Sequence, residues 1–215
     1  MKQTPITIAA ALAAATIATA CATGAAPSAA NVEQLADSMV KSAFRTQGIA
    51  TVDRVTAIDE TLKECNAADA AGKPLDPAVA KRLEAANLQT IKWPGDGKFL
   101  GDWKAGEKLA QSGRGMTWTD NSTKTADNGG NCYNCHQIAP SESSFGTVGP
   151  SLYQFGKKRG NGADVQKYVF SKIFNAKAFN LCSEMPRFGH IGALQEKQIK
   201  DLVALLLDAE SPVNK

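Results

Sequence analysis

The chain has 215 residues, with 24 Lys and Arg against 21 Asp and Glu, and a formal net charge of +3 at pH 7. So small a basic excess excludes the charge footprint of a typical nucleic-acid-binding protein. The length allows one domain, or one domain with an extension.

Residues 1–30 have the layout of a secretory signal peptide, because Lys2 precedes an uncharged, alanine-rich run that ends in small residues. We expect cleavage after Ala20 or at the end of this segment. Losing Lys2 lowers the formal charge from +3 to +2. No later stretch approaches the ~20 apolar residues of a membrane-spanning helix. The sequence therefore predicts export to the periplasm.

Cys21 leaves a second interpretation of this segment open. A cysteine that follows small residues can become the lipid-anchored first residue of a mature protein. The residue three positions before it is Ala18, where a leucine-like residue is usual. We therefore favour simple cleavage over lipid anchoring.

Residues 31–100 are predicted to form a helical extension with an amphipathic pattern. Apolar residues recur at helical spacing from 31 to 46 and again from 52 to 66, and these residues are Val32, Leu35, Met39, Ala43, Val55, Ile58, Leu62 and Cys65. A third helix is predicted to open at Asp76 and Pro77, a good N-cap and first-turn pair. The run "KWPGDGKFLG" then breaks the pattern and indicates a boundary.

Residues 101–215 are predicted to form a second helical unit. A short helix is expected in "DWKAGEKLAQSG", ending at Gly113. Residues 139–163 read as a loop, and Asp164 is expected to cap the next helix. The last helix, about 195 to 208, places apolar residues at i, i+3, i+4 and i+7. The sequence thus predicts an all-α chain.

The chemically informative motif is Cys132-Tyr133-Asn134-Cys135-His136. In an exported chain this spacing indicates covalent attachment of one haem c. Two thiols add across the two vinyl groups on one edge of the porphyrin, and the next side chain is then carried beneath the iron. His136 is therefore the expected proximal ligand. The alternatives are a zinc knuckle, which wants four ligands in two pairs, and a redox dithiol, which belongs at a helix start in a βαβ pattern.

A haem iron held by His136 has one further axial position. The downstream candidates are Met185, His190 and Cys182. We favour Met185, because Pro186 restrains it to an extended conformation and stiffens its loop, and a thioether is a neutral ligand that favours the ferrous state. Methionines more often fill core gaps, which is how we interpret the other two methionines that follow the signal segment.

Cys65 and Cys182 remain as one even pair once Cys21 and the motif are accounted for. In an oxidising compartment a disulfide is the default state. It would tether the loop that carries Met185 to the N-terminal helices. Two buried free thiols are the alternative.

Residues 101 to about 208 resemble a class I cytochrome c. The resemblance rests on the glycine-bearing helix before the motif, on "VGPSL" at 148–152 and "GKKRG" at 156–160, on Met185-Pro186 and on the closing helix. It implies that the Pro150 carbonyl accepts a hydrogen bond from His136. The aromatic contact between first and last helices that this family has is not obvious here, because Ala110 and the leucines of 205–207 occupy that region.

A narrower resemblance rests on "GNCYNCHQI", "CSEMPRFGHIG" and the tail "QIKDLVALLLDAESPVNK". These stretches resemble the SoxX family, the monohaem subunit of the SoxXA thiosulfate-oxidising complex. The resemblance implies an electron-transfer subunit of a heterodimeric S-thiosulfotransferase. Its SoxA partner would join thiosulfate to a cysteine of the carrier SoxYZ, and the haem would pass the released electrons to a small cytochrome c.

Two other functions stay open at this point. The chain could be a free electron carrier that docks through Lys157, Lys158 and Arg159, although such a charge run is more often a solvated loop. It could also be a haem enzyme or gas sensor with an open sixth position. Nothing in the sequence offers a nucleophile, base and orienting group for acyl or phosphoryl chemistry.

Overall fold

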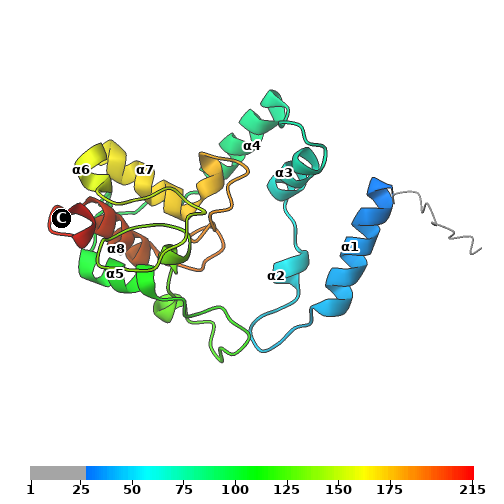
Figure 1. Ribbon diagram of the computed structural model, residues 1–215, viewed down its shortest axis with the longest axis horizontal. Helices are drawn as coiled ribbons and strands as arrows, with labels where there is room; N and C mark the ends of the chain where they lie inside the picture. Colours follow the sequence, from blue (N-terminus) through cyan, green and yellow to red (C-terminus); the bar gives the residue numbers. More distant parts are fainter. Residues whose placement is uncertain (1–27) are drawn as a thin grey trace, which may run out of the picture.

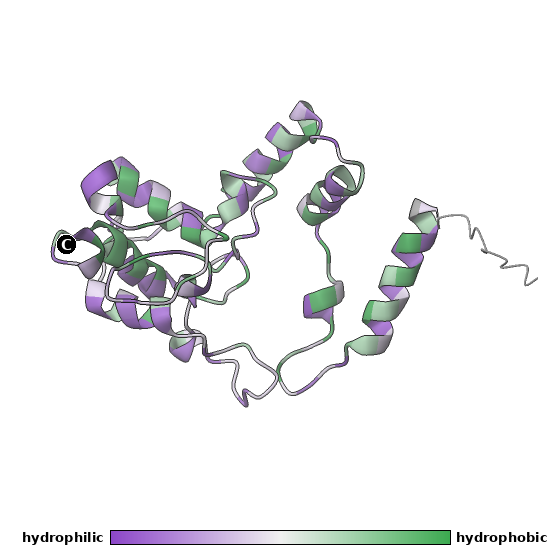
Figure 2. Cartoon of the chain, in the orientation of Figure 1, coloured by the Kyte–Doolittle hydropathy of each residue, from purple (hydrophilic) through white to green (hydrophobic). Residues whose placement is uncertain are grey.

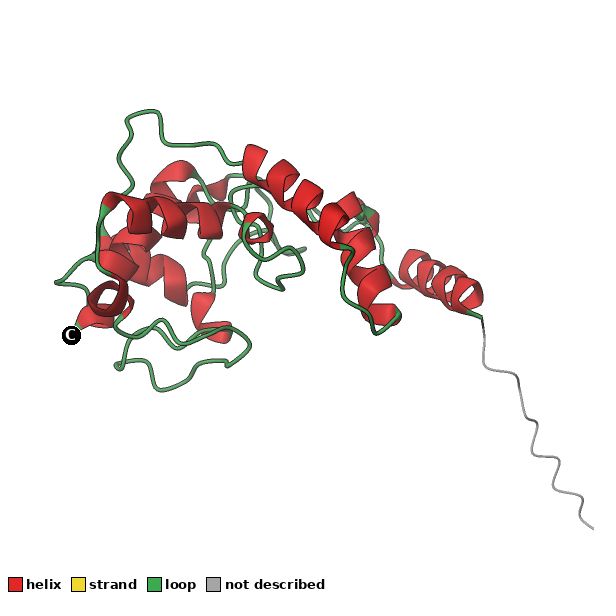
Figure 3. Cartoon of the chain, turned by 90° about the horizontal axis from the view of Figure 1, so that it is seen from above, coloured by secondary structure: helices red, strands yellow, loops and turns green. Residues whose placement is uncertain are grey.

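The computed structural model describes residues 28–215. Cys21 and the predicted signal peptide, apart from its last three residues, lie outside the described part. All regular structure within residues 28–215 is helical, apart from one isolated bridge between Gln47 and Ala50 (Figures 1 and 3). The prediction of an all-α chain is confirmed for these residues. None of their helices is long and apolar enough to cross a bilayer.

The two longest connections between helices in residues 28–215 are the loops from α5 to α6 and from α7 to α8. Their bounds are α1 Ala29–Ala43, α2 Asp53–Thr56, α3 Glu60–Ala70, α4 Pro77–Gln89, α5 Trp103–Gln111, α6 Phe155–Arg159, α7 Ala163–Phe174 and α8 Glu196–Leu207. Short 3₁₀ turns lie at η1 Thr125–Asp127, η2 Cys132–Asn134, η3 Ala176–Ala178 and η4 Pro212–Asn214.

The main hydrophobic core lies where α5, α7 and α8 meet (Figure 1). Helix α8 is buried along almost its whole length because apolar residues point to several sides of it. Phe170 of α7 is fully buried and packs edge-on against Phe99, with ring centroids 5.4 Å apart. The proline- and glycine-rich segment that breaks the helical pattern therefore contributes to this core.

Helices α5 and α8 cross at Gly106, and their contact is the most extensive between any two helices of residues 28–215. A Cβ atom added at Gly106 would overlap the carbonyl oxygen of Asp201. The Asp102 N–H donates to Asp201 Oδ1 over 2.9 Å, and the Gly101 N–H donates to the Lys200 carbonyl oxygen over 3.0 Å. A close backbone approach at Gly106 thus joins the first and last helices of this unit, where the sequence left the packing open.

Helices α3 and α4 form a hairpin that packs against the loop after α7. A second hydrophobic cluster joins Cys65, Leu83 and Leu181. Next to it, the buried Asn175 side chain donates to Asn87 Oδ1 over 3.0 Å, and Asn87 in turn donates to Thr61 Oγ1 over 3.0 Å. Buried amides are stable when their hydrogen bonds are made, so this network fixes the hairpin to the helical unit of residues 101–215.

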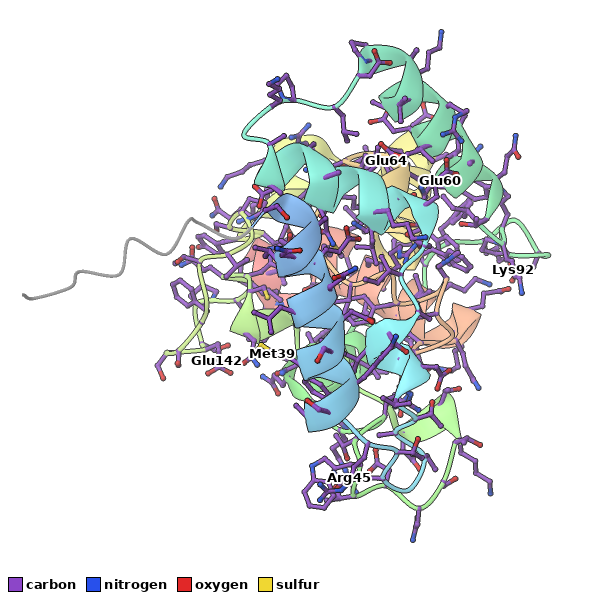
Figure 4. All side chains as sticks on the ribbon, turned by 90° about the vertical axis from the view of Figure 1, so that its right-hand side faces the viewer. Met39, Arg45, Glu60, Glu64, Lys92 and Glu142 are labelled. Carbon is purple, nitrogen blue, oxygen red and sulfur yellow. A yellow bond between two sulfur atoms is a disulfide. The ribbon has the colours of Figure 1, made fainter. Side chains whose placement is uncertain are left out.

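Helix α1 has an apolar stripe that the described residues do not cover. Val32, Leu35 and Met39 are each about half exposed or more, at 49%, 58% and 60%. Figure 2 shows the green stripe along α1, which lies apart from the helical core, and Figure 4 places Met39 on this helix in front of the rest of the molecule. The predicted extension therefore has two parts, a packed hairpin and a separate first helix.

The predicted helix over 52–66 is interrupted in the structure. Its chain leaves the helical conformation at Ala57, and Asp59 then caps α3 by accepting the Leu62 N–H over 2.9 Å. An aspartate at this position favours a helix start over a helix interior. The predicted loop over 139–163 also contains the short helix α6.

Candidate functional site

The cysteine motif forms one 3₁₀ turn. Asn131 takes a left-handed conformation with φ of 48°, and η2 then carries the chain from Cys132 to Asn134. The N–H groups of Cys135 and His136 both donate to the Cys132 carbonyl oxygen, over 3.1 and 2.9 Å. The two thiols, which are free, and the imidazole are therefore held on one compact turn.

Backbone hydrogen bonds to the end of α5 fix the approach to this turn. The Gly130 N–H donates to the Leu109 carbonyl oxygen over 2.8 Å, and the Asn131 N–H donates to the Ser112 carbonyl oxygen over 2.9 Å. From the other side, the buried Gln198 side chain of α8 donates to the Asn128 carbonyl oxygen over 3.0 Å. The crossing of α5 and α8 thus positions the motif.

A second segment, residues 146–152, runs beside the motif and orients its histidine. The Gly149 N–H donates to the Cys135 carbonyl oxygen over 2.8 Å, and the Leu152 N–H donates to the Gln137 carbonyl oxygen over 2.7 Å. This register places the Pro150 carbonyl oxygen 2.7 Å from His136 Nδ1. A carbonyl oxygen only accepts, so Nδ1 is the donor in this contact, and in the neutral imidazole Nε2 then keeps a free lone pair.

The environment of Cys132 keeps its thiol neutral. Burial raises the pKa of Cys132 to about 12, from an ordinary value of 9.0. Redox dithiols and thiolate nucleophiles depend on the opposite shift, toward a low thiol pKa. The motif therefore does not have the electrostatics of a thioredoxin-type site.

Met185 lies in the loop after α7, far downstream of the cysteine motif in the chain. Its side chain is half-buried and packs against the same main core as Cys132. Its N–H donates to Ser183 Oγ over 3.2 Å. His190, the nitrogen candidate in this loop, is exposed, and its backbone N–H donates to the Phe174 carbonyl oxygen over 3.0 Å. Partial burial of the imidazole and the nearby Arg187 charge lower the pKa of His190.

Cys65 and Cys182 form a disulfide that joins α3 to this loop. The bond closes a span of 117 residues, so it stabilises the fold by about 5 kcal/mol in the loop-entropy view. The sequence leaves these two cysteines as a pair, and the structure brings them together. His190, Cys182 and Met185 all belong to the loop that this bond anchors.

An ion pair that the sequence analysis missed lies beside the disulfide. Arg187 Nη1 is 2.6 Å from Asp59 Oδ2, and the Arg187 side chain is only 13% exposed. The two residues are far apart in the chain. A helix start at Asp59 could have been read from the residues that follow it, but its partner could not.

The three basic residues Lys157, Lys158 and Arg159 lie exposed on α6. They form the C-terminal turn of that helix, where cations interact favourably with the helix dipole. Lys158 Nζ also donates to the Tyr153 carbonyl oxygen over 3.1 Å. These three basic residues thus stabilise α6 locally and are also exposed for contact with another molecule.

The motif's donor set fits a covalently held porphyrin. A porphyrin brings its own equatorial nitrogens, so the protein needs to supply thiols for attachment and one or two axial ligands. Two free cysteines on one turn and an imidazole with its Nε2 lone pair available meet the first requirements. The backbone carbonyl behind the imidazole is the second-shell partner that such ligands use.

The chain is similar to an "Uncharacterized lipoprotein" of Aquifex aeolicus (strain VF5). The two are 37% identical over 166 residues, which cover 75% of this chain and 75% of that protein. No family model matches the chain.

Two findings correct the combined description that the sequence suggested. That description was of a signal-bearing, metal-binding periplasmic cytochrome that belongs to a sulfur-oxidising heterodimer. The relative is described as a lipoprotein and not as a cytochrome. Within residues 28–215, no group of three or more His, Cys, Asp and Glu side chains could hold a metal ion. The combined description is therefore wrong for the family. The side chains of residues 28–215 also do not converge to form a metal site of their own.

Proposed function

This chain belongs to the family of the Aquifex aeolicus lipoprotein, and on that premise we propose that it is a lipid-anchored, extracytoplasmic electron-transfer protein with one covalently attached haem c. The observation that carries the haem is the turn that holds the Cys132 and Cys135 thiols beside His136, with Pro150 behind the imidazole. When bound, the haem supplies a one-electron ferric/ferrous couple.

The protein's own residues would hold the haem and orient its axial ligands. Cys132 and Cys135 would fix the group by thioether bonds, and His136 would supply the proximal nitrogen. The Pro150 carbonyl oxygen, which accepts the Nδ1–H, keeps the imidazole in one tautomer and one ring orientation. Met185 would supply sulfur from the other loop, since its side chain packs against the core that Cys132 also contacts.

We propose a class I cytochrome c fold for residues 101–215, with 31–100 as its N-terminal helical extension. The crossing of α5 and α8 at Gly106, with the motif hydrogen-bonded to the end of α5, supports this assignment. So does the order of elements, in which the methionine loop lies between α7 and α8.

Met185→Ala is expected to remove the long-wavelength sulfur-to-iron absorption band of the ferric protein. The reduced variant should then bind carbon monoxide, which a tight methionine ligand resists. Met116→Ala, a change of the same residue type upstream of the motif, should leave both properties unchanged. If His190→Ala instead removes the native sixth ligand, the assignment to Met185 is wrong.

Cys21→Ser is expected to release the protein from the membrane fraction into the soluble fraction. The family relative is a lipoprotein, and Cys21 is the cysteine of this chain that follows a run of small residues. A diacylglycerol anchor at Cys21 replaces the simple cleavage that we favour on sequence grounds. Fractionation with incorporation of labelled palmitate measures this, and a wild-type protein without label would contradict it.

A SoxX-type role inside a SoxXA S-thiosulfotransferase complex is the finer proposal, and it rests on the sequence resemblance alone. In that role SoxA would bind thiosulfate, SoxYZ would carry the product, and this chain would pass electrons to a small cytochrome c. The alternative is a free electron carrier, which the exposed basic residues of α6 favour.

A pull-down with tagged, haem-loaded protein separates these two roles. A stable complex with a second haem protein of the SoxA type is expected for the subunit role. A protein that stays monomeric in the presence of SoxA, and whose electron transfer to a small cytochrome c weakens steeply with added salt, would instead be a free carrier. Such salt dependence is typical of docking through exposed charges.

A further inference from the structure

We propose that helix α3 positions Met185 by holding its loop on both sides of the methionine. The Cys65–Cys182 disulfide anchors the loop three residues before Met185, and the Asp59–Arg187 ion pair anchors it two residues after. This inference rests on the proposed function, because it takes Met185 as the sixth ligand of a bound haem.

The first anchor is covalent. The disulfide keeps the Cα atoms of Cys65 and Cys182 within 5.5 Å of each other. Cys65 itself is buried in the cluster with Leu83 and Leu181, so α3 cannot easily follow if the loop moves away. The start of the methionine loop is therefore fixed to a helix that is packed in place.

The second anchor is an ion pair that also belongs to the start of α3. One oxygen of Asp59 accepts the Leu62 N–H as a helix cap, and the other is 2.6 Å from Arg187 Nη1. Burial acts to raise the pKa of Asp59, but the Leu62 N–H and the Arg187 guanidinium outweigh it and hold that pKa below its ordinary value of 3.8. The carboxylate is thus charged at neutral pH, beside a guanidinium that is largely shielded from water.

These anchors matter because packing between α3 and the loop is incomplete around Met185. A cavity of about 350 Å³ lies between α3 and the loop, and residues of both line it, among them Leu62, Met185 and Arg187. Atoms that border a cavity lack the contacts that hold a packed side chain in place. Lys177 Nζ bridges the Leu181 and Ser183 carbonyl oxygens over 3.1 and 3.3 Å, which shapes the loop from within but does not tie it to α3.

With haem bound, opening of the loop that carries Met185 would take the methionine away from the iron, so the anchors would act on the population of the open loop. Removing an anchor raises that population, and binding of an external ligand speeds up in proportion. The anchoring residues are therefore positioning residues, since they do not themselves touch the iron.

The test measures carbon monoxide binding to the reduced, haem-loaded, full-length protein. We expect binding at least about tenfold faster in Cys65→Ser/Cys182→Ser and about threefold faster in Asp59→Asn. Asparagine caps helices as well as aspartate does, so the second variant removes the charge and leaves the cap. It also keeps the test decisive if the double-serine variant does not fold.

Glu60→Gln is the matched control. Glu60 is the next residue of α3 (Figure 4), and its carboxylate is 2.7 Å from Arg82 of α4 in an exposed pair that does not involve the loop. This variant should bind carbon monoxide at the wild-type rate. All variants should retain wild-type helicity by circular dichroism, so that a faster rate reports the loop and not global unfolding.

The outcomes separate the anchoring from the haem function. If the anchor variants bind carbon monoxide at the wild-type rate and keep the sulfur-to-iron band that Met185→Ala loses, the anchoring is refuted and the proposed function stands. If Met185→Ala itself changes neither property, or the wild-type protein carries no haem, both are refuted.

Discussion

Replacing Gly106 with alanine is expected to destabilise the protein by about 3 kcal/mol, the upper part of the usual range for overpacked sites. Replacing a glycine in the middle of a helix with alanine normally has the opposite effect, because it stabilises the protein by about 0.5–1 kcal/mol. At Gly106 the new Cβ would overlap the Asp201 carbonyl oxygen of α8. That atom belongs to a buried helix backbone, so it cannot move aside like the end of a flexible side chain.

Chemical denaturation followed by far-UV circular dichroism measures this change. Gly95→Ala is the control, because a Cβ at Gly95 meets nothing within 4 Å and its φ lies outside the left-handed region. A Gly106→Ala protein as stable as wild type would mean that α5 and α8 do not cross as closely as described.

Gly149→Ala is expected to displace His136 and to abolish the low-spin haem spectrum in most molecules. A Cβ at Gly149 would overlap the imidazole ring of His136. The ring would have to turn away from the Pro150 carbonyl oxygen, with loss of a hydrogen bond worth about 1 kcal/mol. Thioether attachment through the two cysteines is expected to survive, because the three atoms nearest to the new methyl group all belong to the His136 ring.

Electron paramagnetic resonance of the ferric protein distinguishes the two spin states. The Gly95→Ala control should give the wild-type low-spin signal. A Gly149→Ala protein that is fully low-spin, with one covalently bound haem, would show that His136 does not depend on the close approach of residues 146–152.

Sequence patterns predicted the helices whose start and stop signals are local. The Asp76-Pro77 pair marks the start of α4, and the i, i+3, i+4 pattern around Ile199 marks α8. The pattern over 52–66 failed because apolar spacing continues through Asp59, which caps a new helix instead. Helix α6, with five residues, is too short for periodicity to reveal.

The candidate site likewise has features that a local sequence pattern predicts and features that it does not. The turn of Cys132, Cys135 and His136 is local, so its spacing alone indicates the chemistry. The Pro150 carbonyl came from the family resemblance, since nothing within the motif points to it. The Asp59–Arg187 pair and the amide network of Asn87 and Asn175 join segments far apart in the chain, and no pattern within one segment could have predicted them.

The central claim is that one haem is bound covalently through Cys132 and Cys135. Mass spectrometry of the peptide that contains residues 130–138, from protein matured in an exporting host that attaches haem c, tests it most directly. We predict that this peptide carries the mass of one haem, which acidic acetone does not extract, and that neither cysteine reacts with an alkylating reagent. A colourless protein whose two cysteines are both alkylated would contradict the account.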